Sequence, residues 1–195
     1  MNHGPRSAVA LSMLVVTALA ACGEESRDPP PSFQEDLVRA GQPLLTLVEC
    51  LVGSAAIQYS PPLKNVEQDV TVVTTTVYSN CISLLGGTVT SGTNTIRSFR
   101  PGFSCMDLLS IGSSTSVITW NTGETSTLIQ TRVSSQINGN LAILTNVGTV
   151  ESGKFAGATV TRTTTYLSTD LAACDSAEGL SRLSGPATLS LTGLL

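Results

Sequence analysis

The chain has 195 residues, with 10 basic and 14 acidic side chains, a formal net charge of −4 and a charged fraction of only 12%. Ordinary soluble proteins have about 25% charged residues. Ser, Thr and Gly take their place here, a balance typical of β-rich exported proteins rather than helical cytosolic ones. The acidic balance and the scattered basic residues argue against a nucleic-acid partner.

The first 21 residues have the pattern of an export signal. A short polar start carrying Arg6 is followed by an apolar run over residues 8–18. That run is shorter than the ~20 residues that cross a membrane comfortably. Small residues then precede Cys22, as at a signal-peptide cleavage site. We therefore expect residues 1–21 to be removed and the mature chain to begin at Cys22.

The cleavage site resembles the lipobox of bacterial lipoproteins in its sequence Leu19-Ala20-Ala21-Cys22. The resemblance implies that the Cys22 thiol carries a diacylglyceryl group, with palmitate-like acyl chains as the membrane anchor. Two or more such chains anchor a protein stably, whereas one is marginal. The domain would then be lipid-anchored and extracytoplasmic, on the cell membrane or the outer membrane. Gly23 is not the Asp of a retention signal, which favours the outer membrane in a two-membrane cell.

Residues 22–32 are expected to link this lipidated cysteine to a single β-rich domain, residues 33–195. The linker is acidic and then proline-rich, so extended polyproline II could span ~30 Å. At the start of the domain, Ser32 and Glu35 match a capping box, which predicts a short helix over residues 33–40. Residues 44–52 are apolar and fit either a helix or a buried strand.

From about residue 54 the sequence consists of short Thr- and Val-rich runs separated by Gly, Asn and Pro, which predicts eight strands. Asn138-Gly139 is the clearest hairpin signal, because both residues tolerate positive φ. Consecutive strands with tight turns form an antiparallel meander, which either closes into a small barrel or splits into a sandwich. The fold class is therefore all-β, with one short N-terminal helix. The expected strands cover residues 54–60, 68–79, 87–99, 115–121, 124–136, 140–150, 155–168 and 186–193.

Two features of these strands have alternative explanations. The threonine triplets at residues 74–76 and 163–165 fit ordinary strand propensity on solvated faces, which we favour over a flat array that binds ice or polysaccharide. Trp120 is the single tryptophan. We expect it to be a buried core anchor rather than an exposed platform for stacking on a sugar.

The chain has four cysteines in addition to Cys22. An even number in an exported domain predicts two disulfides, with three possible pairings. Cys50 lies just before the first predicted strand and Cys81 just after the second. These positions are neighbours in an antiparallel hairpin, which favours Cys50–Cys81. Cys105 would then pair with Cys174 and join the loops after the third and seventh strands. No Cys-x-x-Cys spacing is present, so we expect no metal site.

The mature sequence lacks an imidazole, because the only histidine, His3, lies in the export signal. This excludes a Ser-His-Asp triad, a Cys-His pair and a His-ligated metal. Glu67 and Asp69 share a strand face as a possible carboxylate pair, but a solvated strand edge is the simpler interpretation. We expect no catalytic residue and no cofactor. The remaining acidic candidates are expected only to shape loops: Asp107, Asp170 and Asp175.

Three segments resemble an uncharacterised family of small secreted bacterial β proteins. The four downstream cysteines follow in a similar order, and the resemblance spans Cys50 to Gly193. It implies a β fold and export but no activity. Many members of that family have an ordinary signal peptide, whereas the lipobox here favours a tethered form. The segments are Ile118-Thr119-Trp120-Asn121 with Gly123 and Thr125-Ser126-Thr127, then Ser152-Gly153-Lys154-Phe155-Ala156-Gly157, and Leu171-Ala172-Ala173-Cys174.

The sequence favours a non-enzymatic, membrane-tethered β domain for binding or for envelope structure. The alternative is a barrel that carries a small apolar ligand, as lipocalin-type barrels do. A carboxylate-based hydrolase is a weaker third hypothesis. Apart from the membrane, the partner is left open between a protein, a polysaccharide and a small apolar ligand. An interior cavity lined by apolar side chains would favour the carrier, and a filled core the structural module.

Overall fold

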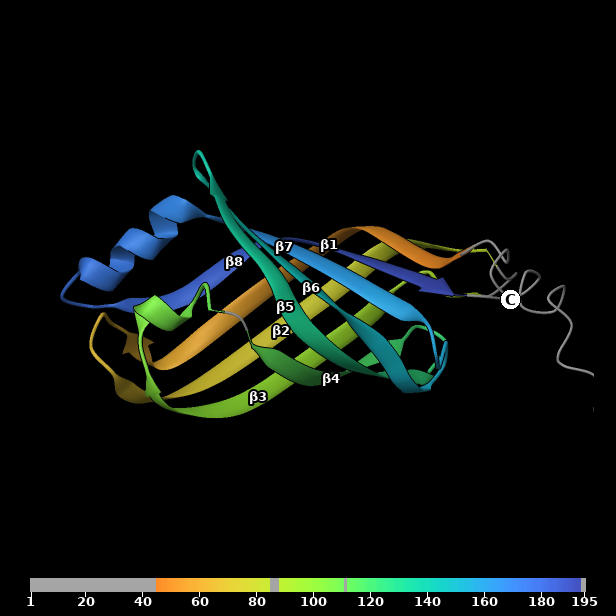
Figure 1. Ribbon diagram of the computed structural model, residues 1–195, viewed down its shortest axis with the longest axis horizontal. Coiled ribbons are helices and arrows are strands. Elements are labelled where there is room, and N and C mark those ends of the chain that lie inside the picture. Colours follow the sequence, from red (N-terminus) through yellow and green to blue (C-terminus); the bar gives the residue numbers. More distant parts are fainter. Residues whose placement is uncertain (1–44, 85–87, 111, 194–195) are drawn as a thin grey trace, which may run out of the picture. The chain divides into compact units, whose positions relative to one another are not determined.

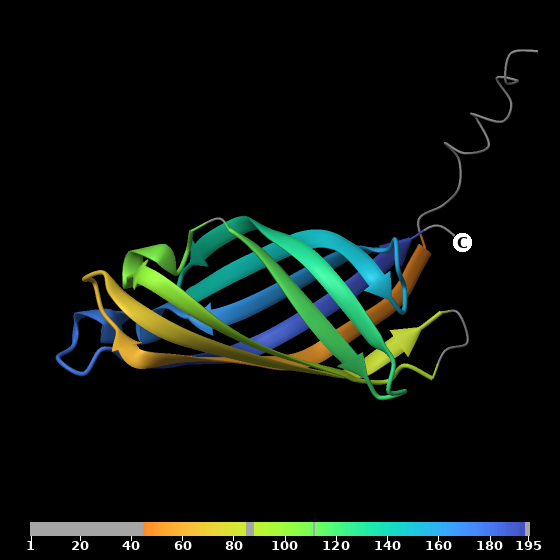
Figure 2. The same ribbon diagram turned by 90° about the horizontal axis from the view of Figure 1, so that it is seen from below.

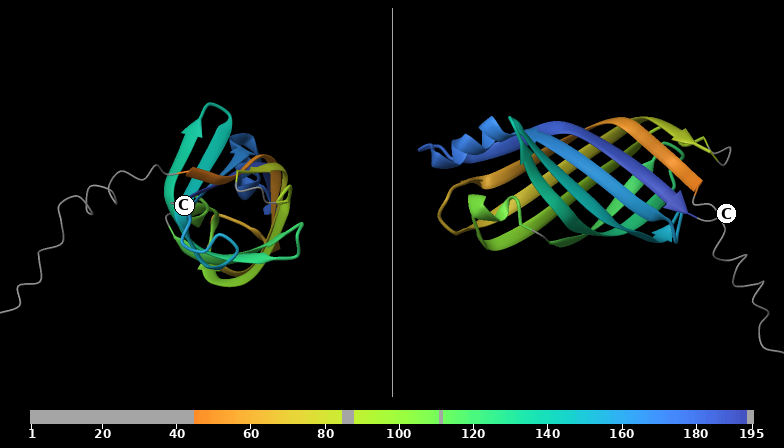
Figure 3. Two further views of the ribbon diagram at one scale, coloured as in Figure 1. Left: turned by 90° about the vertical axis from the view of Figure 1, so that its right-hand side faces the viewer. Right: turned by 45° about the horizontal axis from the view of Figure 1, so that its top comes forward.

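The computed structural model describes residues 45–84, 88–110 and 112–193, which form an eight-stranded antiparallel barrel (Figure 1). Each strand pairs with the next in the chain, and β8 pairs with β1, so the sheet closes without a free edge. The end-on view shows the strands around a common axis (Figure 3). The strands are β1 (Leu45–Leu63), β2 (Gln68–Ser83), β3 (Gly92–Phe103), β4 (Ser113–Trp120), β5 (Thr125–Asn138), β6 (Leu141–Gly153), β7 (Thr159–Leu167) and β8 (Leu180–Gly193).

All eight predicted strands are present, and they close into a barrel rather than a sandwich. β1 begins earlier than predicted, because Val48 and Cys50 already point into the core and the ambiguous apolar segment is a strand. The predicted helix over residues 33–40, the linker and Cys22 lie outside the described residues. Two short 3-10 helices were not predicted, η1 (Cys105–Asp107) and η2 (Ser168–Asp175).

The strands form because their side chains alternate between the barrel interior and solvent, the period-two pattern of a strand. In β8, Ala187, Leu189 and Leu191 are buried. Thr188, Ser190 and Thr192 lie between them and are half-buried, as the alternation in the sequence predicts. Fully burying a leucine contributes about 2 kcal/mol. At the hairpin between β5 and β6, Asn138 pairs with Leu141, and Gly139 has a φ of 57°.

The barrel has two ends of different construction (Figure 2). The terminal end, where β1 starts and β8 finishes, holds an apolar cluster around Trp120, which is 2% exposed. The expectation that Trp120 is a core anchor is therefore confirmed. The opposite end, here the η end, holds a second apolar cluster beside η1 and η2. That second cluster contains Tyr59, Leu63, Val70, Ala142, Leu144, Tyr166, Cys174, Leu180 and Leu183.

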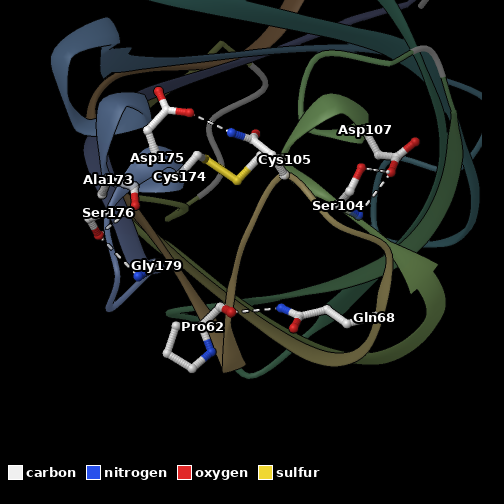
Figure 4. The surroundings of a disulfide bond; sticks show 11 residues. Pro62, Gln68, Ser104, Cys105, Asp107, Ala173, Cys174, Asp175, Ser176 and Gly179 are labelled. Carbon is white, nitrogen blue, oxygen red and sulfur yellow. Dashed lines mark hydrogen bonds between the residues drawn. A yellow bond between two sulfur atoms is a disulfide. The ribbon is translucent and has the colours of Figure 1, made fainter.

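Both predicted disulfides are formed. Cys50 and Cys81 lie directly opposite each other on β1 and β2, with Cα atoms 4.1 Å apart. Cys105 and Cys174 join η1 to η2 at the η end, with Cα atoms 6.2 Å apart (Figure 4). Two disulfides fit an extracytoplasmic location, because such bonds persist in oxidising compartments.

Candidate ligand site inside the barrel

A cavity of about 220 Å³ lies inside the barrel. Its lining includes members of the η-end cluster, such as Leu144 and Leu183, and also polar residues such as Thr74 and Asn146. The interior is therefore neither filled nor purely apolar. A cavity of about 150 Å³ is sufficient to hold benzene. The barrel thus has room for one small organic molecule with both polar and apolar parts.

A row of three polar residues crosses one wall of this cavity. Arg132 on β5 lies directly opposite Asn146 on β6, and Asn146 lies directly opposite Arg162 on β7. All three residues line the cavity. Neighbouring strands are about 4.8 Å apart, so directly opposite side chains on one face are in contact range. The register therefore places two guanidinium groups on either side of one carboxamide.

No carboxylate neutralises the two arginines within the cavity lining. Asp107 is the one acidic residue among the described lining residues, and its Oδ2 already accepts hydrogen bonds from the backbone N–H and the hydroxyl of Ser104, at 2.9 and 2.8 Å. A third arginine, Arg100, also lines the cavity and is exposed to solvent. The cavity is therefore positively charged in a protein that is acidic overall.

The two arginines have unused hydrogen-bond donors. Arg132 donates from Nη1 to the backbone carbonyls of Leu108 and Ser110, at 2.6 and 3.3 Å. The buried Nε atoms of Arg132 and Arg162 have no partner among the described residues. Burial lowers the pKa of Arg132, and the nearby charge of Arg162 lowers it further, while Tyr166 and Tyr59 act in the opposite direction. Guanidinium groups remain charged in proteins despite such shifts.

The chain's three tyrosines gather around these arginines. Tyr59 and Tyr166 line the cavity, and all three tyrosine side chains are buried. Burial is the main cause that raises the pKa of each phenol above its ordinary value of 10.0. For Tyr78, the neighbouring charge of Arg162 opposes this rise. The tyrosines are therefore neutral hydroxyl donors near neutral pH.

Further buried polar atoms beside the row have no partner within the described residues. They include both amide atoms of Gln130, which is 1% exposed and lies two residues before Arg132 on β5, outside the cavity lining. Buried polar groups are normally hydrogen-bonded, because leaving one unpaired costs about 1–3 kcal/mol. The Nε atoms of Arg132 and Arg162, which do line the cavity, are therefore donors available to a polar group inside it.

β3 and β4 have the shortest pairing of any neighbouring strands in the barrel. These strands share only three residue pairs, from Gly92 opposite Trp120 to Asn94 opposite Ile118. Toward the η end they separate (Figure 2). Residues on both sides of the separation line the cavity, among them Ser98 on β3 and Ser114 on β4. The cavity therefore lies beside the unpaired stretches of β3 and β4.

Of the acidic residues singled out in the sequence, only Asp107 lines the cavity, and the possible carboxylate pair does not form a site. Glu67 and Asp69 are exposed, and Asp69 accepts a hydrogen bond of 3.1 Å from the backbone N–H of Gly102. At the η end, Asp175 accepts a hydrogen bond of 2.6 Å from Asn65, beside the Cys105–Cys174 bond (Figure 4). Within the described ranges, no three His, Cys, Asp or Glu side chains gather as metal ligands.

The interpretation of the threonine triplets as solvated faces is wrong for their inward members. Thr76 and Thr164 are buried, and Thr74 lines the cavity, whereas Thr75 is exposed. The cause is the period of two, which sends the first and third residues of a triplet to the same face. In 74–76 that face is the interior, and in 163–165 only the central residue points inward.

Arg132 and Arg162 are not recognisable as site residues when the basic residues are treated only as scattered along the sequence. A signal was present in the strand alternation. On β5, Leu128, Gln130 and Arg132 follow one another at spacings of two, so Arg132 shares the interior face of a buried leucine. On β7, Val160 precedes Arg162 in the same way. Two arginines on inward positions would have indicated a charged interior.

Comparisons with protein-family models, with curated proteins and with solved structures found no match.

Proposed function

We propose that the protein is a lipid-anchored, extracytoplasmic, non-enzymatic carrier whose barrel binds one small organic ligand in its interior. The observation that carries the proposal is the cavity of about 220 Å³, with unpaired polar groups on its wall. Small eight-stranded barrels either fill their interior with side chains or hold one small ligand. The cavity therefore favours the carrier over a purely structural barrel.

Two observations support the location. The sequence of residues 1–22 resembles an export signal with a lipobox, which supports an acylated Cys22 ahead of the domain. The two disulfides fit an oxidising compartment. Within the part of the chain that the structure describes, no helix is both long and apolar enough to span a bilayer.

The anchor is tested by replacing Cys22 with Ser in the full precursor. We expect the variant to lose labelling by radioactive palmitate and to leave the membrane fraction, because the thioether that carries the acyl chains cannot form. Cell fractionation and lipid labelling measure both effects. Membrane association of the unlabelled variant, resistant to high salt, contradicts the anchor.

Interior binding is tested with octanol, an uncharged molecule with one polar end, added to the mature chain carrying Cys22→Ser. We expect saturable binding at one site by calorimetric titration. Thr74→Trp should reduce the affinity at least tenfold, because the indole occupies the cavity that Thr74 lines. Thr75→Trp is the matched control, since Thr75 is the exposed neighbour on the same strand.

Thermal unfolding of both tryptophan variants verifies that each is folded before the titrations are compared. Two outcomes contradict an interior site. One is that neither octanol nor its carboxylate counterpart octanoate binds the mature chain carrying only Cys22→Ser. The other is an equal loss of binding in the Thr74→Trp and Thr75→Trp variants.

A further inference from the structure

In the row of Arg132, Asn146 and Arg162, two positive charges have no negative partner in the cavity lining, and a bound anion would supply one. The two guanidinium groups lie on either side of Asn146 in one wall, and Arg162 disfavours the charged form of Arg132. Taking a charge out of water without an opposite partner is costly. The one acidic residue of the lining, Asp107, is already bonded to Ser104. An anion placed between the arginines would supply the missing opposite charge.

The donors around the row match a carboxylate. A guanidinium group donates two parallel hydrogen bonds to the two oxygens of a carboxylate, and these charge-assisted bonds are stronger than neutral ones. Asn146 offers an amide between the two arginines, and the tyrosine hydroxyls beside them remain protonated. The row and the tyrosines beside it thus offer several hydrogen-bond donors suited to one small negative group.

Part of the cavity lining toward the η end is apolar. On β6 the inward residue next to Asn146 is Leu144, and the lining there continues through Ile57, Val72 and Leu183. A ligand whose anionic group contacts the arginines would therefore place an apolar portion against these side chains. Compared with the ~150 Å³ that holds benzene, 220 Å³ accommodates a chain of about eight carbons or a substituted aromatic ring.

We propose that the barrel binds a small monocarboxylate with an apolar tail, its carboxylate held between Arg132 and Arg162 and its tail directed toward the η end. This rests on the proposed function as an interior carrier and names its ligand class. The exposed Arg100, on the stretch of β3 that does not pair with β4, attracts the anion toward the cavity that it lines.

The test compares octanoate with octanol, which have tails of equal length and differ in charge. The mature chain carrying Cys22→Ser is titrated with each at neutral pH. Octanoate should bind about 10- to 100-fold more tightly, the effect of charge-assisted hydrogen bonds. Octylamine, with a positive head group, should not bind. As the pH falls through the pKa of octanoic acid, octanoate loses its charge and should no longer bind more tightly than octanol. This control requires no substitution in the protein.

Arg162→Gln should reduce the ratio of octanoate to octanol affinity at least tenfold. Arg97→Gln is the matched control: Arg97 is an exposed residue of β3, so this variant removes the same charge outside the cavity and should keep the ratio. Equal affinities for the acid and the alcohol on the unaltered sequence overturn the carboxylate proposal but leave the carrier standing. A preserved ratio in Arg162→Gln also overturns it. Absence of binding by both molecules overturns the carrier itself.

Discussion

Replacing Cys105 and Cys174 together by Ala is expected to lower the free energy of unfolding by about 4 kcal/mol. The bond joins residues separated by 69 positions, and in the chain-entropy model a loop of that length restricts the unfolded chain by about this amount. Urea denaturation monitored by circular dichroism measures the loss. A loss below about 1 kcal/mol contradicts the assignment of this bond as a main stabiliser of the η end.

The same variant should also bind octanoate more weakly. Arg132 donates to backbone carbonyls of Leu108 and Ser110, in the segment that the disulfide ties to η2. Loosening that segment releases Arg132 from its position in the cavity wall. The comparison is the double Ala variant of Cys50 and Cys81, whose bond lies at the terminal end. It should lose stability and keep its preference for octanoate. Equal loss of that preference in both variants would show a general effect of unfolding.

Trp120→Ala is expected to destabilise the barrel by about 4 kcal/mol, because it removes the largest side chain of the terminal-end cluster and leaves a cavity. The indole N–H donates to the hydroxyl of Ser126 at 2.8 Å, and the ring meets Phe155 edge-on with centroids 5.7 Å apart. The ring also packs on Gly92, where a Cβ would approach the indole Cε3 to 2.8 Å.

Trp120→Phe is the control for the size of the aromatic ring. It keeps much of the apolar contact but removes the N–H that bonds to Ser126, so we expect a loss of about 1–2 kcal/mol. Thermal or urea unfolding of both variants gives the comparison. If the Ala and Phe variants unfold alike, the cluster at the terminal end does not depend on the volume of Trp120.

Much of the fold could be predicted because strands and hairpins have local signals. The alternation of Ala187, Leu189 and Leu191 and the turn at Gly139 are visible within a few residues. Barrel closure was not visible, since it depends on β8 pairing with β1, and the same alternation also suits a sandwich. The 3-10 helices were missed because short loop helices have no apolar periodicity. Disulfide pairing was predictable because hairpin geometry makes Cys50 and Cys81 neighbours.

The candidate site was harder to predict, because it depends on register across three strands. Arg132, Asn146 and Arg162 are distant in sequence and meet only if β5, β6 and β7 are aligned at these residues. A slip of one residue would turn an arginine outward. The pairing of β5 with β6 contains two irregularities, one of them directly after Arg132. Sequence alternation indicates which face an arginine occupies, but the neighbours on that face come from the assembled barrel.

The most direct test of the central claim is a crystal structure of the mature chain, carrying Cys22→Ser, with para-iodobenzoate. Anomalous scattering locates the iodine independently of the protein. We expect one iodine inside the barrel, on the apolar side toward Leu144 and Leu183, with the carboxylate about 3 Å from guanidinium nitrogens of Arg132 and Arg162. Iodine found only on the outer surface, with side chains filling the interior, would contradict it.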